Sequence, residues 1–377
     1  MMQKRTISIK LVPTSEQAQK LLELQREFNN VRNAVSESAS VKRCFNQYQL
    51  HNLAYKPIRK KFKLGSQMVC IAIKTVCSSY KDRVRKVRSK EVPQISFRQG
   101  GSVHLDKRTY SLIKGGVSLY TLSKRVKVPF KMGEFQRKYM ERGIPKEAEL
   151  VRRKKNWFFN LVLDVPDAPP RSERGGILGV DLGENNIACT STGKIFGGGK
   201  LRYERDAALA LRARLQSNGT KSAKRTLRKV SGKESRHVKD VNHCVSKALV
   251  EEASAFGCDT IAMENLTNIR SRIRAGKRMR SRLHRWPFAQ TQSFTHYKAV
   301  DAGMSVFYGN PAYTSRTCNR CGQLGVRVGH KFECKNCVIF LHSDVNAALN
   351  IRGIAALFSA ATGAVNRRNV ASIAESA

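Results

Sequence analysis

Apolar and polar residues alternate at the start of the chain and then change to a helical spacing. Residues 6–11 alternate and end before Pro13, which is typical of a strand. From Ser15, leucine, phenylalanine and valine recur every three or four residues, and a later apolar stripe with a basic end extends the helical pattern to about residue 90. The pattern therefore predicts one strand followed by a small helical module over residues 15–92.

From Pro93 the pattern changes to short alternating runs that glycines interrupt. These runs predict an antiparallel β module over residues 93–166, which the first strand can join. Trp157 and Phe159 lie in the last run. Aromatic residues in an alternating strand are more often core than base-stacking, so we expect both to be buried. The predicted strands are residues 94–97, 103–105, 115–119, 127–130 and 157–165.

Strands and helices alternate beyond a proline-containing linker at residues 167–172. This alternation predicts an α/β sheet domain. After Gly353 the sequence is rich in Ala, Ser and Asn, and a weakly ordered tail is expected. The predicted strands are residues 176–180, 187–190, 259–263 and 305–308, and the predicted helices are a long basic region over about 203–256 and a helix over 288–302.

The charge of the chain narrows the class of partner. Its 377 residues include 70 Lys and Arg against 28 Asp and Glu, a net charge of +42. In a compact state the excess positive charges repel one another, and binding to a polyanion relieves this repulsion. Nucleic acid is therefore the first partner predicted. A hydrophobic fraction of 41% excludes a disordered basic tail. No long apolar run or secretory signal is present, so we expect no membrane partner and a cytoplasmic location, nucleoid-associated in a prokaryote.

Three acidic residues stand at the ends of predicted elements. Asp181 and Glu264 each end a predicted strand, and Asp344 opens a predicted helix over residues 345–351. Each alone is more often a helix cap or turn residue. Acids at the carboxyl ends of strands project from the sheet edge where α/β folds bind ligands. As a set they predict a site for two Mg²⁺ ions and phosphodiester hydrolysis, because three converging acids repel one another unless cations lie between them.

Four of the ten cysteines form two close pairs, which 12 residues separate: Cys318 with Cys321, and Cys334 with Cys337. In an intracellular chain this spacing predicts a four-cysteine zinc ribbon with one structural ion rather than disulfides. Gly322 follows the first pair, but Val338 follows the second, so the second turn is expected to be less regular. The other six cysteines are scattered and are expected to be ordinary buried residues.

Two basic stretches accompany the acids. Residues 221–239 hold eight Lys or Arg against one Glu, and residues 270–285 hold eight without an acid. A basic run is usually a solvated face, but two that border a proposed metal site favour contact with a phosphate backbone, without sequence readout. The predicted contacts are Lys224, Arg225, Arg228, Lys229, Arg270, Arg272, Arg274, Lys277, Arg278, Arg280, Arg282 and Arg285.

The order of acid, acid, cysteine pairs and acid resembles the TnpB (OrfB) family of transposon-encoded, RNA-guided nucleases, which are relatives of the type V CRISPR effectors. The resemblance implies that Asp181, Glu264 and Asp344 are the catalytic, Mg²⁺-binding acids of an RNase H-like (RuvC) α/β domain with an inserted four-cysteine zinc ribbon. It covers about residues 176–352 and rests on the motifs Gly179-Val180-Asp181-Leu182-Gly183, Met263-Glu264-Asn265-Leu266, Thr314–Gly322 and Ser343–Ile351.

The resemblance also implies a multidomain α/β and β architecture. The expected domains are an oligonucleotide-gripping wedge β-barrel over 1–14 and 93–170, a helical recognition lobe over 15–92, and a RuvC-like nuclease domain over 171–377, with the ribbon at 313–341 and a weakly ordered tail after about 355. The implied partners are a transposon-derived guide RNA and target double-stranded DNA, whose pairing reads the sequence. The implied cofactors are two Mg²⁺ ions, with Mn²⁺ as a substitute, and one structural Zn²⁺.

Three other functions fit part of the sequence. A guided DNA-binding repressor would have lost its nuclease activity, and a strand-transferring transposase would also use three acids. An ATPase related to actin and Hsp70 would share the loop Val180-Asp181-Leu182-Gly183. It would also need a second phosphate loop and an adenosine loop, for which the sequence holds no convincing candidate. The hypotheses differ in what they predict. A nuclease cuts DNA and a repressor binds it without cutting, a transposase joins strands, and an ATPase hydrolyses ATP without nucleic acid.

Overall fold

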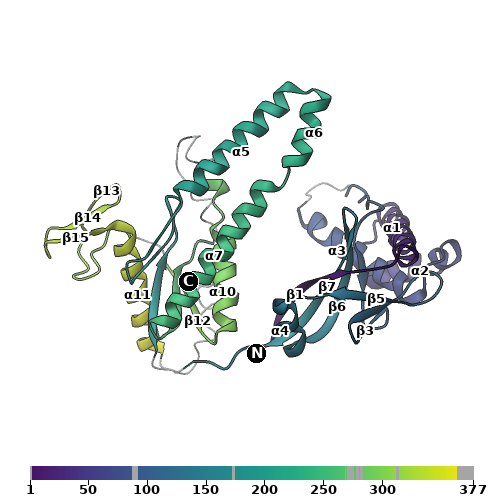
Figure 1. Cartoon of the computed structure of the whole chain (residues 1–377), viewed down its shortest axis with the longest axis horizontal. Helices are drawn as coiled ribbons and strands as arrows, with labels where there is room; N and C mark the ends of the chain where they lie inside the picture. The colour runs from purple at the N-terminus through teal and green to yellow at the C-terminus, as the bar shows by residue number, and fades with distance from the viewer. Residues whose placement is uncertain are drawn as a thin grey trace. The chain divides into compact units, whose positions relative to one another are not determined.

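The computed structural model divides the chain into two compact units, residues 1–166 and residues 167–377 (Figure 1). It describes residues 2–86, 92–171, 175–267, 283–310 and 314–362, together with positions 269, 276 and 280. Within these residues no helix has both the length and the apolar character that crossing a membrane requires.

The amino-terminal unit is an antiparallel sheet of seven strands in the order β2-β6-β7-β1-β5-β4-β3, against which helices pack. The first strand of the chain lies in the middle of this sheet, between β7 and β5. The strands are β1 (Met2–Leu11), β2 (Val103–Leu105), β3 (Tyr110–Ile113), β4 (Gly116–Leu119), β5 (Val126–Lys131), β6 (Ile144–Arg153) and β7 (Asn156–Pro166). The helices are α1 (Ser15–Val41), α2 (Gln47–Lys61), α3 (Ser66–Lys86) and α4 (Glu134–Arg142).

The core of this unit lies between the sheet and the helices. Alternate residues of β1 and β7 point into it, and they share one buried cluster with residues of α1 and α3. Trp157 and Phe159 are 2% and 0% exposed, so their predicted burial is confirmed. Alternation in these strands therefore reflects one face packed on helices.

Residues 94–97, predicted to be a strand, join no sheet. The hydroxyl of Ser36 donates to the Ile95 carbonyl at 2.7 Å, and the Phe97 backbone N–H donates to Asn33 Oδ1 at 2.7 Å. Polar side chains of α1 therefore provide the hydrogen bonds that a neighbouring strand would supply. Alternation alone did not reveal this, because the pattern does not specify the partner of an extended backbone.

The carboxyl-terminal unit contains a five-stranded mixed sheet in the order β10-β9-β8-β11-β12. β8, β11 and β12 are parallel, whereas β9 and β10 are antiparallel to their neighbours. All four strands predicted in this half are present. The strands are β8 (Gly176–Asp181), β9 (Asn186–Thr190), β10 (Ile195–Gly197), β11 (Cys258–Glu264) and β12 (Ser305–Gly309), and the helices are α5 (Gly199–Asn218), α6 (Lys221–Val230), α7 (Lys233–Ala255), α10 (Phe288–Asp301) and α11 (Ser343–Thr362).

The long basic helical region predicted over residues 203–256 is three helices. Gly219 and Gly232 have φ angles of 64° and 72° and separate α5, α6 and α7. Glycine adopts this left-handed backbone at little cost, whereas other residues do not. α5 and α7 extend together beyond the sheet, and α6 lies at their far end (Figure 1).

Helix α11 packs directly on β8 because Gly179 has no side chain. A Cβ atom at Gly179 would lie 2.0 Å from the Ala348 carbonyl oxygen and 2.9 Å from the Arg352 backbone nitrogen. Ile351 and Ala355 of the same helix are buried in a cluster with Ala262 of β11. The close approach places the first turn of α11 beside the end of β8.

Helix α11 continues to Thr362, so residues 356–362 are helix, whereas the sequence predicts a weakly ordered tail after about residue 355. Alanine favours helix more than any other residue, and burial of Ala355 adds packing that composition did not show. Residues 363–377 lie outside the described residues.

We expect Gly179→Ala to destabilise the carboxyl-terminal unit by about 3 kcal/mol, because α11 must move away from β8 to accommodate the methyl group. Chemical denaturation followed by circular dichroism measures the loss. Gly197→Ala in β10 is the control, because nothing lies within 4 Å of a Cβ there. Its effect should stay within about 0.5 kcal/mol. Equal losses in both variants would contradict the packing argument.

Candidate active site

The three predicted acids lie at one end of the carboxyl-terminal sheet. β8 and β11 are parallel neighbours with Val180 opposite Met263, so Asp181 and Glu264, the next residues, emerge at the same edge. Asp344 lies in the first turn of α11, which packs on β8. Glu264 and Asp344 are 8% and 7% exposed, and Asp181 is partly buried. The fold therefore brings together residues that 163 positions of sequence separate, from 181 to 344.

The environment of this edge disfavours the charged form of two of the acids. Burial raises the pKa of Asp181 well above its ordinary value, and the negative charges of Glu264 and Asp344 raise it further. Burial also raises the pKa of Glu264. A cation bound among these oxygen atoms would relieve both effects. Because all three side chains are carboxylates, the donor set fits a hard divalent cation.

Asp344 is oriented by polar residues from other elements. Asn186 of β9 donates from Nδ2 to Asp344 Oδ2 at 2.8 Å, and Arg327 Nη2 lies 3.2 Å from Oδ1. The Ser343 hydroxyl also donates to Oδ1, at 3.1 Å. Sequence reasoning missed Asn186 and Arg327, because nothing in their local pattern identifies the acid they contact.

Glu264 is oriented by Thr314, the first residue of a motif that was identified in the sequence without predicting this contact. Thr314 Oγ1 donates to Glu264 Oε1 at 2.6 Å, and this hydrogen bond opposes the rise in the pKa of Glu264. Thr314 is 5% exposed. Its hydrogen bond therefore favours the charged carboxylate in a buried setting.

Two histidines lie beside Asp344. Ligand atoms of His330, His342 and Asp344 all lie within 4.8 Å of one another, and the two imidazole rings stack at 5.2 Å. The Asp344 backbone N–H donates to His342 Nδ1 at 3.3 Å. The histidines and Arg327 come from a three-stranded hairpin sheet, β13 (Val326–Val328), β14 (Lys331–Cys334) and β15 (Ile339–His342), which therefore borders the third acid.

The four paired cysteines converge on one point. Their sulfur atoms all lie within 4.8 Å of one another, and Cys321 Sγ is 3.6 Å from Cys334 Sγ. A hydrogen bond from Asn336 lowers the pKa of Cys321 to about 6, so this thiol ionises readily. Four converging sulfurs form a suitable cage for a thiophilic ion.

The turn after the second cysteine pair is strained at Val338, although it is not the less regular turn that the sequence predicts, since a left-handed residue follows each pair. Val338 has a φ angle of 52° and Gly322, at the matching position of the first pair, has 74°. A β-branched residue in this left-handed region is disfavoured by contact of its Cβ with the backbone. Both turns therefore adopt the same conformation, but only one has the residue that suits it.

The other six cysteines are not all buried, which corrects the prediction. Four are buried, at positions 44, 77, 189 and 258, whereas Cys70 is half-buried and Cys244 is exposed on α7. The average burial of cysteine does not decide which face of a helix a given residue occupies.

Two asparagines connect the cysteine cluster to α11. Asn346 is fully buried, and its Oδ1 accepts hydrogen bonds from the backbone and side chain of Asn319 at 3.1 and 2.9 Å. Asn350, one turn later, donates to the carbonyls of Thr314 and Thr317 at 2.7 Å. The segment that begins with Thr314 and contains the first cysteine pair is therefore joined to the helix that carries Asp344. The four-residue spacing of Asn346 and Asn350 was the available sequence signal.

The first basic stretch does not border the acids, which corrects the prediction. Lys224, Arg225, Arg228 and Lys229 lie on α6. This helix lies beyond α5, whose 20 residues span about 30 Å. Position along the chain was misleading because α5 carries the following residues away from the sheet.

Most of the second basic stretch lies outside the described residues, namely Arg270, Arg272, Arg274, Lys277, Arg278 and Arg282. Arg280 is exposed, and Arg285 Nη2 lies 3.8 Å from Asp206 Oδ1. The predicted phosphate contacts of both stretches therefore stay predictions.

Two family models match the carboxyl-terminal part of the chain. Residues 160–270 match a family described as a probable transposase, OrfB of IS605 type, and residues 288–351 match the Cas12f1-like TNB domain. The first match contains Asp181 and Glu264, and the second contains the four paired cysteines and Asp344.

Curated relatives and a solved structure agree with these models. The chain is 39% identical over 137 residues to the TnpB-like protein MJ0751 of Methanocaldococcus jannaschii, which covers 36% of this chain and 49% of that protein. It is 30% identical over 222 residues to the CRISPR-associated endodeoxyribonuclease Cas12f1 of Sulfoacidibacillus thermotolerans, covering 53% and 50%. The chain thus spans about half the length of these relatives.

The fold is also similar to that of Cas12f1 in a cryo-EM structure of its complex with sgRNA and target DNA. The TM-score is 0.57 at 14% identity, covering 93% of this chain and 99% of that one. The fold likeness extends to both units, although sequence similarity concentrates in the second. As the sequence predicts, the chain is similar to the TnpB-like proteins and to the Cas12f1 effectors.

Proposed function

We propose that this chain is an RNA-guided DNA endonuclease of a transposable element and that Asp181, Glu264 and Asp344 form its catalytic site. The observation that carries the proposal is the meeting of these acids at one sheet edge, where burial and the charges of Glu264 and Asp344 raise the pKa of Asp181. The relatives support the substrate class, since the matched Cas12f1 is an endodeoxyribonuclease and its complex contains sgRNA and target DNA.

The three acids would hold two Mg²⁺ ions, or Mn²⁺ in their place. When bound, such ions activate water and stabilise the leaving oxygen of a phosphodiester. The contribution of the chain itself is to orient the carboxylates: Asn186 and Arg327 contact Asp344, and Thr314 contacts Glu264. The burial of Glu264 and Asp344 strengthens these interactions because little water competes with them.

The rest of the proposed architecture follows the family. The carboxyl-terminal unit would be a RuvC-like domain, with the paired cysteines holding one structural Zn²⁺ in a ribbon. The seven-stranded sheet and helices α1–α3 would be the wedge and recognition lobe that grip the guide RNA and target DNA. The charge of +42 supports this role, since guide, hybrid and displaced strand are all polyanions.

A direct test uses the chain purified with co-expressed guide RNA, a matched duplex and Mg²⁺. We expect cut DNA strands only when guide and target match. Tight binding without cutting would instead support a guided repressor. Joined products would support a transposase, and ATP hydrolysis without nucleic acid would support the ATPase alternative.

Thr314→Val should weaken the proposed site at low pH. Loss of the hydrogen bond lets the already raised pKa of Glu264 rise further, so the carboxylate loses its charge at a higher pH than in the natural protein. The acidic limb of the pH–rate profile should therefore move to higher pH, and the Mg²⁺ concentration for half-maximal cutting should rise severalfold. Thr314→Ser keeps the hydroxyl and should retain the natural profile. Identical pH–rate profiles for Thr314→Val and Thr314→Ser would show that the Thr314 hydroxyl has no role in the site.

A further inference from the structure

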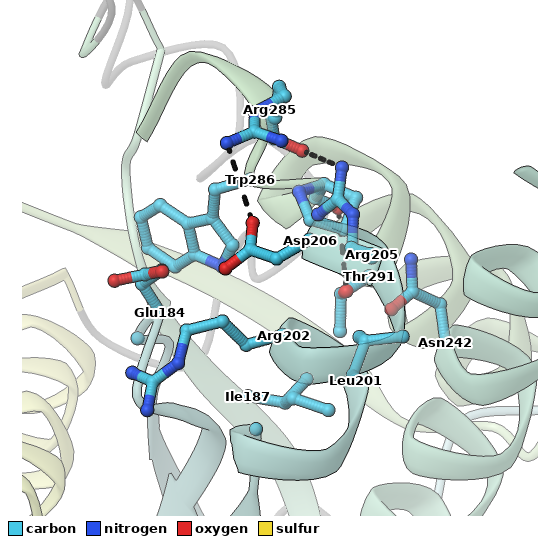
Figure 2. Close-up of a pocket in the computed structure, with 13 residues that line it drawn as sticks. Glu184, Ile187, Leu201, Arg202, Arg205, Asp206, Asn242, Arg285, Trp286 and Thr291 are labelled. Carbon is cyan, nitrogen blue, oxygen red and sulfur yellow. Dashed lines mark hydrogen bonds and ion pairs between the residues drawn. The ribbon is translucent and has the colours of Figure 1, made fainter. Parts of the chain in front are cut away.

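A pocket opens beside the turn that follows Asp181. Gly183 and Glu184 form one edge, Leu201 and Arg202 of α5 lie below, and Trp286 and Asn242 complete the walls. Figure 2 shows the indole of Trp286 and the side chain of Arg202 on one side of the pocket and Asn242 on the other. The pocket is thus built by residues that lie between the first two acids in the sequence and by residues that follow the second acid.

The inner wall of this pocket holds an unsatisfied polar atom. Asn242 is 0% exposed, and its Nδ2 donates to Gln290 Oε1 at 2.8 Å. Asn242 Oδ1 has no hydrogen-bond partner among the described residues. Buried carbonyl oxygens normally accept a hydrogen bond, so this atom indicates a donor that enters the pocket from outside.

The outer wall offers an aromatic face and a cation. Arg205 Nε lies 2.8 Å from Glu234 Oε1, and Arg205 Nη2 donates to the Arg285 carbonyl at 2.7 Å, which positions the backbone just before Trp286. Arg202 Nη1 donates to Asn185 Oδ1 at 2.7 Å. Because Asn185 is neutral, this contact does not neutralise the positive charge of Arg202. An aromatic ring next to a cation is the combination that binds single-stranded nucleic acid.

We propose that this pocket takes the edge of one nucleobase of the DNA strand to be cut, an inference that rests on the proposed function. The base lies against Trp286, donates its exocyclic amino group to Asn242 Oδ1, and leaves its phosphate near Arg202. The pocket has room for only a few water-sized groups, since about 40 Å³ is open to their centres and one water needs about 10–15 Å³. Only the edge of a base therefore enters, while the ring stays at the mouth.

The proposal includes a base preference. Adenine and cytosine carry an exocyclic amino donor, whereas thymine carries a carbonyl oxygen at the corresponding position. A thymine carbonyl would face Asn242 Oδ1 and repel it. The pocket therefore favours adenine and cytosine over thymine at one position near the cut.

Tryptophan fluorescence tests this preference without requiring cleavage. The chain has two tryptophans, and Trp157 is 2% exposed in the amino-terminal unit, so Trp157→Phe leaves Trp286 as the reporter. The RNA-bound full chain carrying this change and Asp181→Asn is titrated with oligo-dA, oligo-dC and oligo-dT that do not match the guide. We expect quenching by dA and dC at concentrations about fivefold lower than by dT.

Asn242→Leu should remove the difference between the oligonucleotides while keeping the quenching. Arg202→Ala should weaken all three equally, which provides a second variant if Asn242→Leu fails to fold. Equal affinities for all three in the reporter protein, or no quenching by any, would mean that the pocket holds water only and would overturn the proposal. If the protein with Asp181 intact cuts guided DNA but the reporter protein shows no quenching, only this inference fails. Quenching in the reporter, with no cutting by the protein in which Asp181 is intact, would instead refute the proposed nuclease.

Discussion

Asp181→Asn is expected to abolish DNA cutting, by roughly a thousandfold or more, while leaving the binding of guide RNA and target DNA unchanged. The asparagine keeps the shape of the side chain but removes the charge that would hold the metal ions. Cleavage on gels at saturating Mg²⁺ measures the first effect, and electrophoretic mobility shift of the complex measures the second. Asp240→Asn is the matched control, because Asp240 is exposed on α7 and outside the proposed site.

The same variant should be more stable than the natural protein when no metal is present. The pKa of Asp181 in the folded state is raised, so its contribution to stability is present at low pH and is lost as the pH rises through the folded-state pKa. At neutral pH the charged acid is therefore destabilising, and asparagine relieves this cost. The gain should shrink as the pH falls below the raised folded-state pKa and should vanish below about pH 4, the ordinary range for aspartate. Added Mg²⁺ should stabilise only the natural protein.

Two outcomes would contradict this role for Asp181. A metal-free variant less stable than the natural protein would indicate that the carboxylate is a structural group. Loss of RNA or DNA binding together with cutting would also indicate a structural role.

Cys334→Ser should release the ion from the cysteine cluster and, with it, most of the cutting activity. Cys334 is 1% exposed and its sulfur lies among the other three. Binding of a structural ion supplies the folding energy of such a segment, so its loss should unfold residues near the cluster. Asn346 and Asn350 join this segment to α11, and Thr314 joins it to Glu264, so the acids should lose their alignment. We expect at least about a hundredfold loss of cutting.

Metal analysis, thermal unfolding and cleavage together test this prediction. Cys244→Ser is the control, since Cys244 is exposed on α7 and distant in sequence from the paired cysteines. Unchanged metal content in Cys334→Ser would reject the cluster as a metal site. Loss of metal with full cutting would show instead that the ribbon and the acids are independent.

Local chemistry and spacing determined much of this protein from sequence alone. The alternation in β1 and β7 predicted their burial, and the apolar runs that end in Asp181 and Glu264 predicted two strands with acids at their carboxyl ends. Two CxxC pairs predicted a cluster of four sulfurs, because each pair forms a tight turn whose cysteines must lie close together. These features depend on residues near one another in the chain, where the periodicity of strand and helix is strong.

Only the tertiary structure decided which distant residues meet. Asn186 and Thr314 contact the acids across 158 and 50 positions of sequence, and Arg327 reaches Asp344 from a different element. The basic residues of α6 lie away from the acids because Gly219 ends a straight helix about six turns long. The pocket of Asn242 and Trp286 likewise joins segments that have no common pattern. The pattern of hydrophobic and polar residues specifies which face of a helix or strand is buried. Long-range packing determines which other element covers that face.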